Sequence, residues 1–183
     1  MTVFEFVLTL YSIVVALGIA RVLTGYVALI EYRKEIANLP LFMIWLSLLL
    51  LAHIVWWFSL WNNNAAQSFT LFEAFMTFHV PAFLFMASRL LVPSESELET
   101  IAERYAKLRV PFLVCFSLAF IPGPLAGGVA TGDWSTAVYL MTIGVFLLVG
   151  AASSNMRLQY FAAVTATVTY VMFAIQFRSV VTG

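Results

Sequence analysis

Charged residues are scarce in this 183-residue chain, which has nine Lys and Arg, nine Asp and Glu and two His. The charges balance, and no Lys/Arg cluster is large enough to bind nucleic acid, so nucleic acid is not expected as a partner. The single cysteine, Cys115, excludes an intramolecular disulfide and a cysteine-based zinc site. Because its neighbours are apolar, we interpret it as a small buried side chain.

Catalytic signatures are also missing. The sequence has no His-Glu-x-x-His and no Gly-x-Ser-x-Gly, and neither His53 nor His79 has a neighbouring Asp that would suggest a catalytic triad. With two histidines and few carboxylates in the apolar runs, intramembrane hydrolysis is hard to assemble. We therefore predict that the protein is not an enzyme.

Apolar residues, in contrast, make up 63% of the chain, and the mean hydropathy is +0.98. A soluble domain of this size cannot hide so many apolar side chains in one core. About 20 apolar residues in a helix cross the hydrocarbon core of a bilayer. The sequence therefore predicts an all-α, polytopic transmembrane bundle of six helices in one domain, 1–183. The predicted spans are 4–30, 39–61, 69–92, 110–125, 134–152 and 158–177.

The only strongly polar stretch, residues 93–109, is predicted to form a short cytoplasmic amphipathic helix between spans three and four. Ser94 or Ser96 is the expected N-cap, with an acidic residue three positions on. The stretch either lies on the membrane surface or runs into span four with a bend at Pro111, and it is also a candidate docking site for a cytoplasmic partner. Its apolar side consists of Leu98, Ile101, Ala102, Tyr105 and Leu108.

Basic residues predict how the chain is threaded, because short loops rich in Lys and Arg stay cytoplasmic. They occur in the first, third and fifth connections, whereas the second carries no charge and the fourth only Asp133. Both termini are therefore predicted to face away from the cytoplasm, in a multi-pass protein of the inner (cytoplasmic) membrane. Arg21, Arg89 and Arg157 are expected to anchor the cytoplasmic interface.

Helix one carries a pattern of small and polar residues, spaced three or four apart. The members are Glu5, Thr9, Ser12, Ala16, Ala20, Thr24 and Ala28. In lipid, small residues allow close approach of two backbones and hydroxyls add hydrogen bonds, so such a face joins helices. Three interpretations stay open: packing inside one subunit, a pore-lining face and an oligomer-forming face.

Four ionisable residues complete the candidate site. Glu5 and Glu73 lie near the predicted outer ends of their helices, where together they would attract cations, or where water simply solvates them. His53 and His79 lie at similar depths, about 13 and 16 Å from the outer ends. If they face each other, they would ligate a b-type haem or a metal or relay protons; otherwise they are packing histidines. The short connection between their helices argues against room for haem, so no cofactor is expected.

Residues 11–25 (YSIVVALGIARVLTG), followed by the helix with His53, Trp56, Trp57 and Trp61, resemble a group of small uncharacterised bacterial multi-helix membrane proteins. The resemblance covers about the first half of the chain. It implies a location in the bacterial cytoplasmic membrane, and it brings no activity, ligand or catalytic residue with it.

The leading hypothesis is a non-enzymatic homo-oligomer that forms a pathway or binding cavity for an ion or small solute. Its candidate lining residues are Glu5, Thr9, Ser12, Glu73, His53 and His79. The alternatives are an accessory or scaffold subunit of a larger membrane complex, with a membrane-protein partner, and a bis-histidine haem or metal protein.

Overall fold

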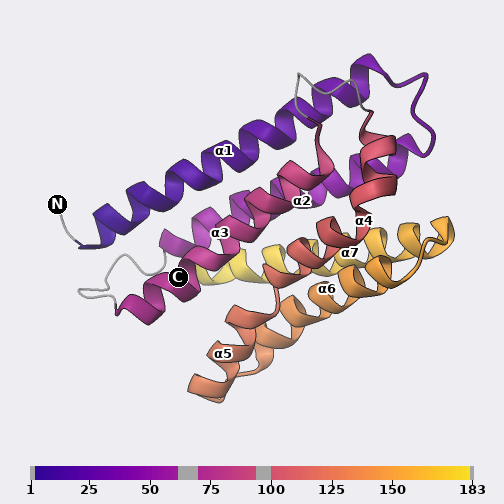
Figure 1. Cartoon of the computed structure of the whole chain (residues 1–183). Coiled ribbons are helices and arrows are strands. Elements are labelled where there is room, and N and C mark those ends of the chain that lie inside the picture. Colours follow the sequence, from indigo (N-terminus) through magenta and orange to yellow (C-terminus); the bar gives the residue numbers. More distant parts are fainter. Residues whose placement is uncertain (1–2, 62–69, 94–99, 182–183) are drawn as a thin grey trace.

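The computed structural model of the chain describes residues 3–61, 70–93 and 100–181. Within these residues every regular element is an α-helix, and six helical stretches are long and apolar enough to cross a membrane. The predicted all-α, multi-pass fold is therefore confirmed. Figure 1 shows the helices in chain order: α1 (Val3–Glu31), α2 (Leu39–Trp61), α3 (Leu71–Leu91), α4 (Ile101–Leu118), α5 (Pro122–Thr131), α6 (Ser135–Ala152) and α7 (Met156–Val181).

The fourth span differs most from its predicted bounds. The amphipathic extension and the start of this span form one continuous helix, α4, which contains Pro111. Ile101 and Tyr105 from the extension are buried, so this segment packs against the bundle rather than lying apart on the surface. After a break at residues 119–121, the apolar stretch that follows forms the separate short helix α5.

A capping box starts α4. The Thr100 hydroxyl accepts a hydrogen bond from the Glu103 N–H, and the Glu103 carboxylate accepts one from the Thr100 N–H, which satisfies two amides that have no partner within the helix. The N-cap of α4 is therefore Thr100, a residue that the sequence analysis did not name. The predicted caps Ser94 and Ser96 fall outside the described residues.

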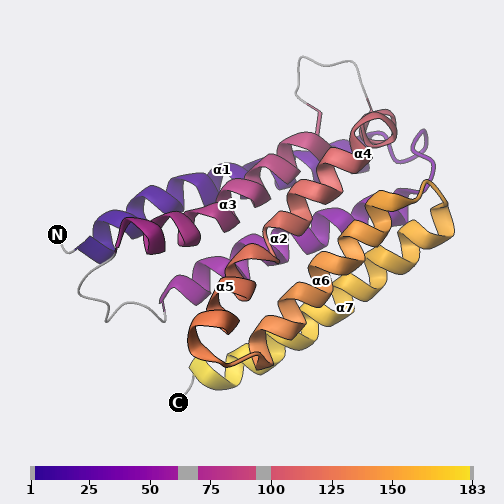
Figure 2. The same ribbon diagram turned by 60° about the horizontal axis from the view of Figure 1, so that its bottom comes forward.

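The six spans pack in a closed circle. Their order around it is α1, α2, α7, α6, α4 and α3, and α3 completes the circle by packing against α1 (Figures 1 and 2). α2 also touches α3, and α5 lies against α6 and α3. Spans that are distant in the sequence, such as α2 and α7, therefore share one core.

Large aromatic side chains fill the middle of this circle. The rings of Trp45 and Phe112 lie 5.9 Å apart between centroids, and the series continues through Phe116, Phe120 and Tyr170 at separations of 5.9, 5.6 and 5.4 Å. Trp45, Phe112 and Phe116 are completely buried. Such contacts are typical of edge-to-face and tilted aromatic pairs. These rings connect α2 to α7 through α4, and they fill the interior of the bundle between these helices.

The outer surface of the bundle is apolar as well. Phe58, Val129 and Ile175 are 59%, 71% and 67% exposed, and they belong to three different helices. A soluble protein of this size would rarely expose so many large apolar side chains over its whole circumference. Lipid chains are the solvent that suits this surface, which agrees with an integral membrane protein.

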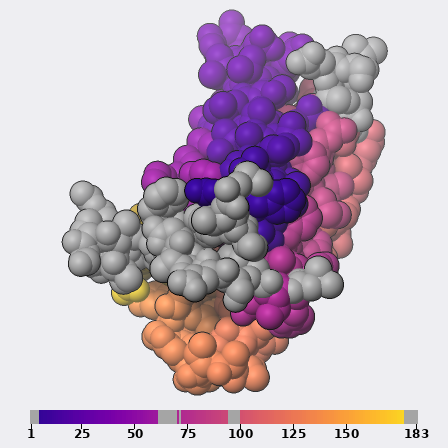
Figure 3. Space-filling model, turned by 90° about the vertical axis from the view of Figure 1, so that its left-hand side faces the viewer, coloured from indigo at the N-terminus to yellow at the C-terminus, as the bar shows by residue number. Residues whose placement is uncertain are grey.

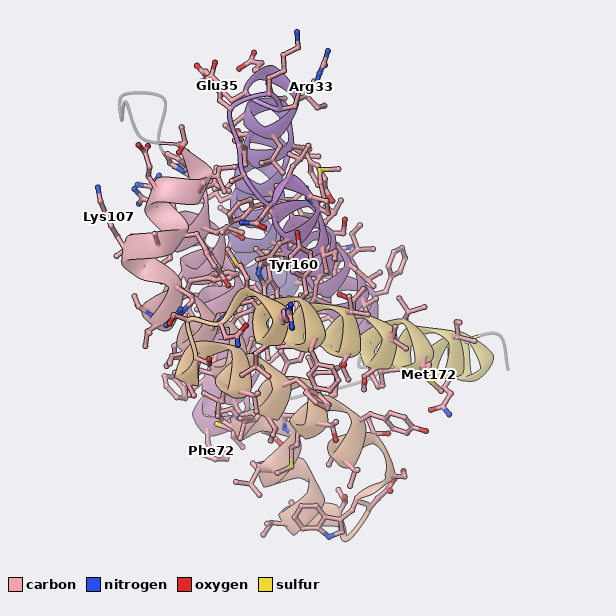
Figure 4. The ribbon with its side chains drawn as sticks, turned by 90° about the vertical axis from the view of Figure 1, so that its right-hand side faces the viewer. Arg33, Glu35, Phe72, Lys107, Tyr160 and Met172 are labelled. Carbon is pink, nitrogen blue, oxygen red and sulfur yellow. The ribbon has the colours of Figure 1, made fainter. Side chains whose placement is uncertain are left out.

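The termini and the basic connection between α1 and α2 lie at opposite ends of the bundle. α1 begins and α7 ends at the same end (Figures 1 and 2). At the opposite end Arg33 and Glu35 point away from the bundle between α1 and α2, as does Lys107 on α4 (Figure 4). This arrangement agrees with the predicted number and direction of the spans. The assignment of the basic end to the cytoplasm stays a prediction.

Candidate functional site

α1 turns one face toward α2 and α3. Its buried residues alternate in spacings of four and three, which keeps them on one side of a helix. They are Tyr11, Val15, Gly18, Val22, Gly25 and Leu29. A Cβ built on Gly25 would lie 2.7 Å from a methyl group of Val92 and 3.1 Å from Leu46. Glycine therefore lets the α1 backbone lie directly on its neighbours.

The small and polar residues of α1 lie on its outward side. The exposed ones are Glu5, Thr9, Ala16 and Ala20, and the partly exposed ones are Ser12, Thr24 and Ala28. Figure 3 shows α1 in indigo at the edge of the molecule. This placement argues against the interpretation that the stripe packs inside one subunit, and it leaves the face open to lipid or to another protein.

The hydroxyl groups on this face bond within their own helix. Thr9 donates to the Glu5 carbonyl at 2.8 Å, Ser12 to the Leu8 carbonyl at 2.5 Å and Thr24 to the Ala20 carbonyl at 3.0 Å. Such bonds satisfy a hydroxyl in lipid without a partner from outside. Because these hydroxyl groups are already hydrogen-bonded within α1, the feature that this face presents to a neighbouring helix is the small size of its side chains.

Tyr11 joins α1 to α2 and α3, and the sequence analysis did not identify it. Its hydroxyl donates to the Ala74 carbonyl on α3 at 2.6 Å. Its ring lies 6.0 Å from that of Trp56 on α2 and 5.4 Å from that of Phe78 on α3. The signal available in the sequence was its position at the start of a series with alternating spacings of four and three. The other members of this series are glycines and aliphatic residues.

Glu73, one of the two carboxylates predicted to attract cations, caps the start of α3. Its carboxylate accepts from the N–H and the hydroxyl of Thr70 at 2.8 and 2.9 Å, and the Glu73 N–H donates to the Thr70 hydroxyl at 3.1 Å. Glu5 is exposed on α1. The capping box gives Glu73 a structural role at the start of its helix.

His53 is completely buried between α2 and α1. Its Nδ1 lies 2.8 Å from the Leu49 carbonyl oxygen. Because a carbonyl only accepts hydrogen bonds, Nδ1 carries the proton, and Nε2 keeps a lone pair that is free to accept. A Cβ built on Gly18 would lie 2.0 Å from Nε2. Since a Cα–Cβ bond is about 1.5 Å long, Nε2 lies within about 3.5 Å of the Gly18 Cα. The α1 backbone therefore covers this lone pair.

His79 is 7% exposed, and its ring faces a different helix. Nδ1 is hydrogen-bonded to the Met76 carbonyl, which selects the same tautomer as in His53. The Cε1–Nε2 edge of the ring lies against α5, where a Cβ on Gly123 would be 2.9 Å from Cε1 and 3.5 Å from Nε2. Among the described residues, Nε2 has no hydrogen-bond partner.

The six candidate lining residues are thus spread over separate places. Three lie on the outer face of α1, Glu73 caps α3, and the two imidazoles contact different helices. Gly18 leaves no space for an iron atom at Nε2 of His53, so the packing does not fit a bis-histidine haem. In the part of the chain that the structure describes, no three His, Cys, Asp or Glu residues group as metal ligands.

Two arginines bind the end of α3. Arg21 donates to the Val92 carbonyl at 2.8 Å, and Arg104 donates to two carbonyls of the last turn of α3 at 3.1 and 3.2 Å. Guanidinium groups suit the unpaired carbonyls and the negative dipole at a helix C-terminus. Arg21 therefore joins α1 to α3, whereas the other two predicted anchors, Arg89 and Arg157, are exposed.

A second polar group that sequence reasoning missed is the amide of Gln159, which is 1% exposed. Its Oε1 accepts from the Tyr105 hydroxyl at 2.5 Å, and its Nε2 donates to the carbonyls of Gly150 and Ser153. The amide thereby joins α4 to the turn between α6 and α7. The lone Gln at the start of an apolar run was the only signal for this contact.

Comparisons of the chain with family models, with curated proteins and with solved structures found no significant match.

Proposed function

We infer that this chain is a non-enzymatic multi-pass membrane protein that associates with copies of itself through the outward face of α1. The observation that supports this is the position of Ser12, Ala16, Ala20, Thr24 and Ala28, which follow each other every four residues on that face. In lipid, such series of small residues favour close helix–helix contact, because the backbones gain van der Waals contacts that bulkier side chains prevent.

The packed aromatic centre of the bundle favours a solute pathway between subunits over one through a single chain. Glu5, Thr9 and Ser12 share the α1 face that would form the contact. A carboxylate near the outer end of such a contact favours cations over anions. The proposed role is therefore a homo-oligomer with a pathway or binding cavity for an ion or small solute at the subunit contacts.

The test of self-association is the double substitution Ala16→Leu/Ala20→Leu. Two leucines fill the space that close helix contact needs, so we expect the oligomer to dissociate to monomers in lipid nanodiscs or mild detergent, as measured by light scattering. The matched control is Val164→Leu/Val168→Leu, which adds bulk to exposed positions of α7 and leaves the oligomer intact.

A wild-type monomer would refute the self-association. If that monomer is extracted with a stoichiometric second membrane protein, the accessory or scaffold role takes its place.

In liposomes, we expect ion flux from the wild type and the Val164→Leu/Val168→Leu control, and none from the Ala16→Leu/Ala20→Leu variant. Absence of wild-type flux over a broad pH range would contradict the pathway.

The threading gives a further prediction. We expect a tag on either terminus to react only with reagents applied from outside the cytoplasm, since the basic connections stay inside. The resemblance of residues 11–25 supports a bacterial inner membrane as the location. The measurement is labelling of intact cells or spheroplasts with impermeant reagents, with a tag between α1 and α2 as the opposite control. Labelling of a terminus from the cytoplasmic side would reverse the orientation.

A further inference from the structure

The fourth span is interrupted beside His79. α4 ends at Leu118, the N–H groups of Ala119 and Phe120 bond back to carbonyls one turn earlier, and α5 begins at Pro122. Residues 121–124 are partly exposed. Interrupted helices bring backbone carbonyls and helix ends to membrane depth, where they bind ions or small solutes in transporters.

The prolines at this break remove donors and leave acceptors. Pro122 and Pro124 have no N–H, so the carbonyls of Leu118 and Phe120 lack the donor that a continuous helix would supply. The same prolines occupy the first and third positions of α5, so its N-terminus keeps the Gly123 N–H but loses two others. The C-terminal dipole of α4 therefore dominates, and it favours positive charge.

The unpartnered lone pair of His79 lies at this break. The ring is more than nine-tenths buried, its tautomer is set by Met76, and its Nε2 edge contacts Gly123 in the first turn of α5. A buried acceptor without a donor is costly, because water no longer satisfies it. Phe83 adds an aromatic ring edge-on to the imidazole, with centroids 6.5 Å apart.

We propose that the α4–α5 break beside His79 binds ammonium or the head of a primary ammonium compound. The acceptors at the break are an imidazole nitrogen and backbone carbonyls, so the ligand must be rich in N–H donors. Ammonium donates in four directions and is attracted to aromatic rings. Hard metal cations prefer oxygen ligands alone and suit an imidazole less well. The site lies within one subunit and does not depend on self-association.

His53 supplies an internal control. It has the same tautomer, and its Nε2 is likewise buried without a hydrogen-bond partner among the described residues, but this atom lies directly against the backbone of Gly18 in the α1–α2 contact and not at a helix break. These two are the only histidines of the chain. A probe that reports on both imidazoles therefore separates binding at the break from a general effect of salt.

The experiment uses the full chain with ¹⁵N-labelled histidine in lipid nanodiscs. His79→Gln and His53→Gln assign the two imidazole signals by loss of one signal each. Ammonium chloride is then titrated at constant ionic strength against sodium chloride. We expect a saturable shift of the His79 Nε2 signal with ammonium, little change with sodium and no change at His53. Methylammonium is the second probe, because it distinguishes a site for the free ion from one that accepts a primary ammonium head.

Three results would overturn the proposal. The first is a His79 signal that does not move, including one that already carries a hydrogen bond from a bound water. The second is an equal response to sodium, and the third is an equal response of both histidines. Because oligomeric state is measured separately by light scattering, a monomer that binds ammonium would refute only the self-association, and an oligomer that does not bind would refute only this site.

Discussion

Gly18→Ala will lower the free energy of unfolding by about 3 kcal/mol, the upper part of the range for overpacked cores. The added methyl group would lie 2.0 Å from Nε2 and 2.7 Å from Cδ2 of His53, far inside van der Waals contact. The imidazole is completely buried and held by the Leu49 carbonyl, so it has little freedom to move away. α1 must therefore separate from α2, and equilibrium unfolding in bicelles or detergent measures the loss.

The matched control is Gly127→Ala in α5. A Cβ there meets nothing within 4 Å, so the substitution removes the flexibility of glycine without a clash. We expect no loss, and a gain of up to about 1 kcal/mol from helix propensity. If both alanine variants changed stability equally, the close contact between Gly18 and His53 would be refuted.

A double substitution tests the pair directly. His53→Ala removes the ring with which the new methyl group would clash. Gly18→Ala should therefore lower the free energy of unfolding much less in the His53→Ala background than in the wild type. Residues in contact have coupling energies of about 0.5–3 kcal/mol, and distant residues are additive. Strict additivity here would mean that α1 and α2 do not meet at these positions.

Gln159→Leu is expected to destabilise the protein by about 3 kcal/mol, the second large effect. The amide accepts from Tyr105 and donates to the carbonyls of Gly150 and Ser153, all at one buried contact. Leucine has a similar size but makes none of these bonds. Each buried group left without a partner costs about 1–3 kcal/mol. Chemical or thermal unfolding of the purified protein measures the loss.

Two tyrosines provide a graded control for this network. Tyr105→Phe removes one of the three hydrogen bonds of the Gln159 amide and should lower the free energy of unfolding by about 1 kcal/mol. Tyr139→Phe removes a hydroxyl that accepts one 3.3 Å bond from the exposed Gln176, so it should cost almost nothing. A Gln159→Leu variant as stable as Tyr139→Phe would show that the amide does not hold α4 to the α6–α7 turn.

The spans themselves could be predicted because the bilayer requires them. A stretch of about 20 apolar residues that satisfies its own backbone is a helix, whatever its neighbours are. This rule gave the number of spans and, except for the fourth, ends close to those in the structure. Its bounds were wrong for the fourth span, because the polar residues before Pro111 belong to the same helix, which was one of the two arrangements that the sequence left open.

Which side of each helix faces inward could not be predicted in the same way. In water the apolar side of a helix turns inward, but in lipid both sides are apolar and the pattern loses this meaning. On α1, the series from Ser12 to Ala28 and the series from Tyr11 to Leu29 both have helical spacing. Only contact with α2 and α3 distinguishes the two.

The histidines illustrate the same limit. Their depth follows from counting residues along a helix, at about 1.5 Å per residue. Their partners do not, because His53 meets Gly18 from an earlier helix and His79 meets Gly123 from a later one. Composition and hydropathy thus determine that the described residues form six helices long and apolar enough to cross a membrane. The neighbours of each side chain depend on how the six helices surround one another, since lipid itself does not distinguish one apolar helix face from another.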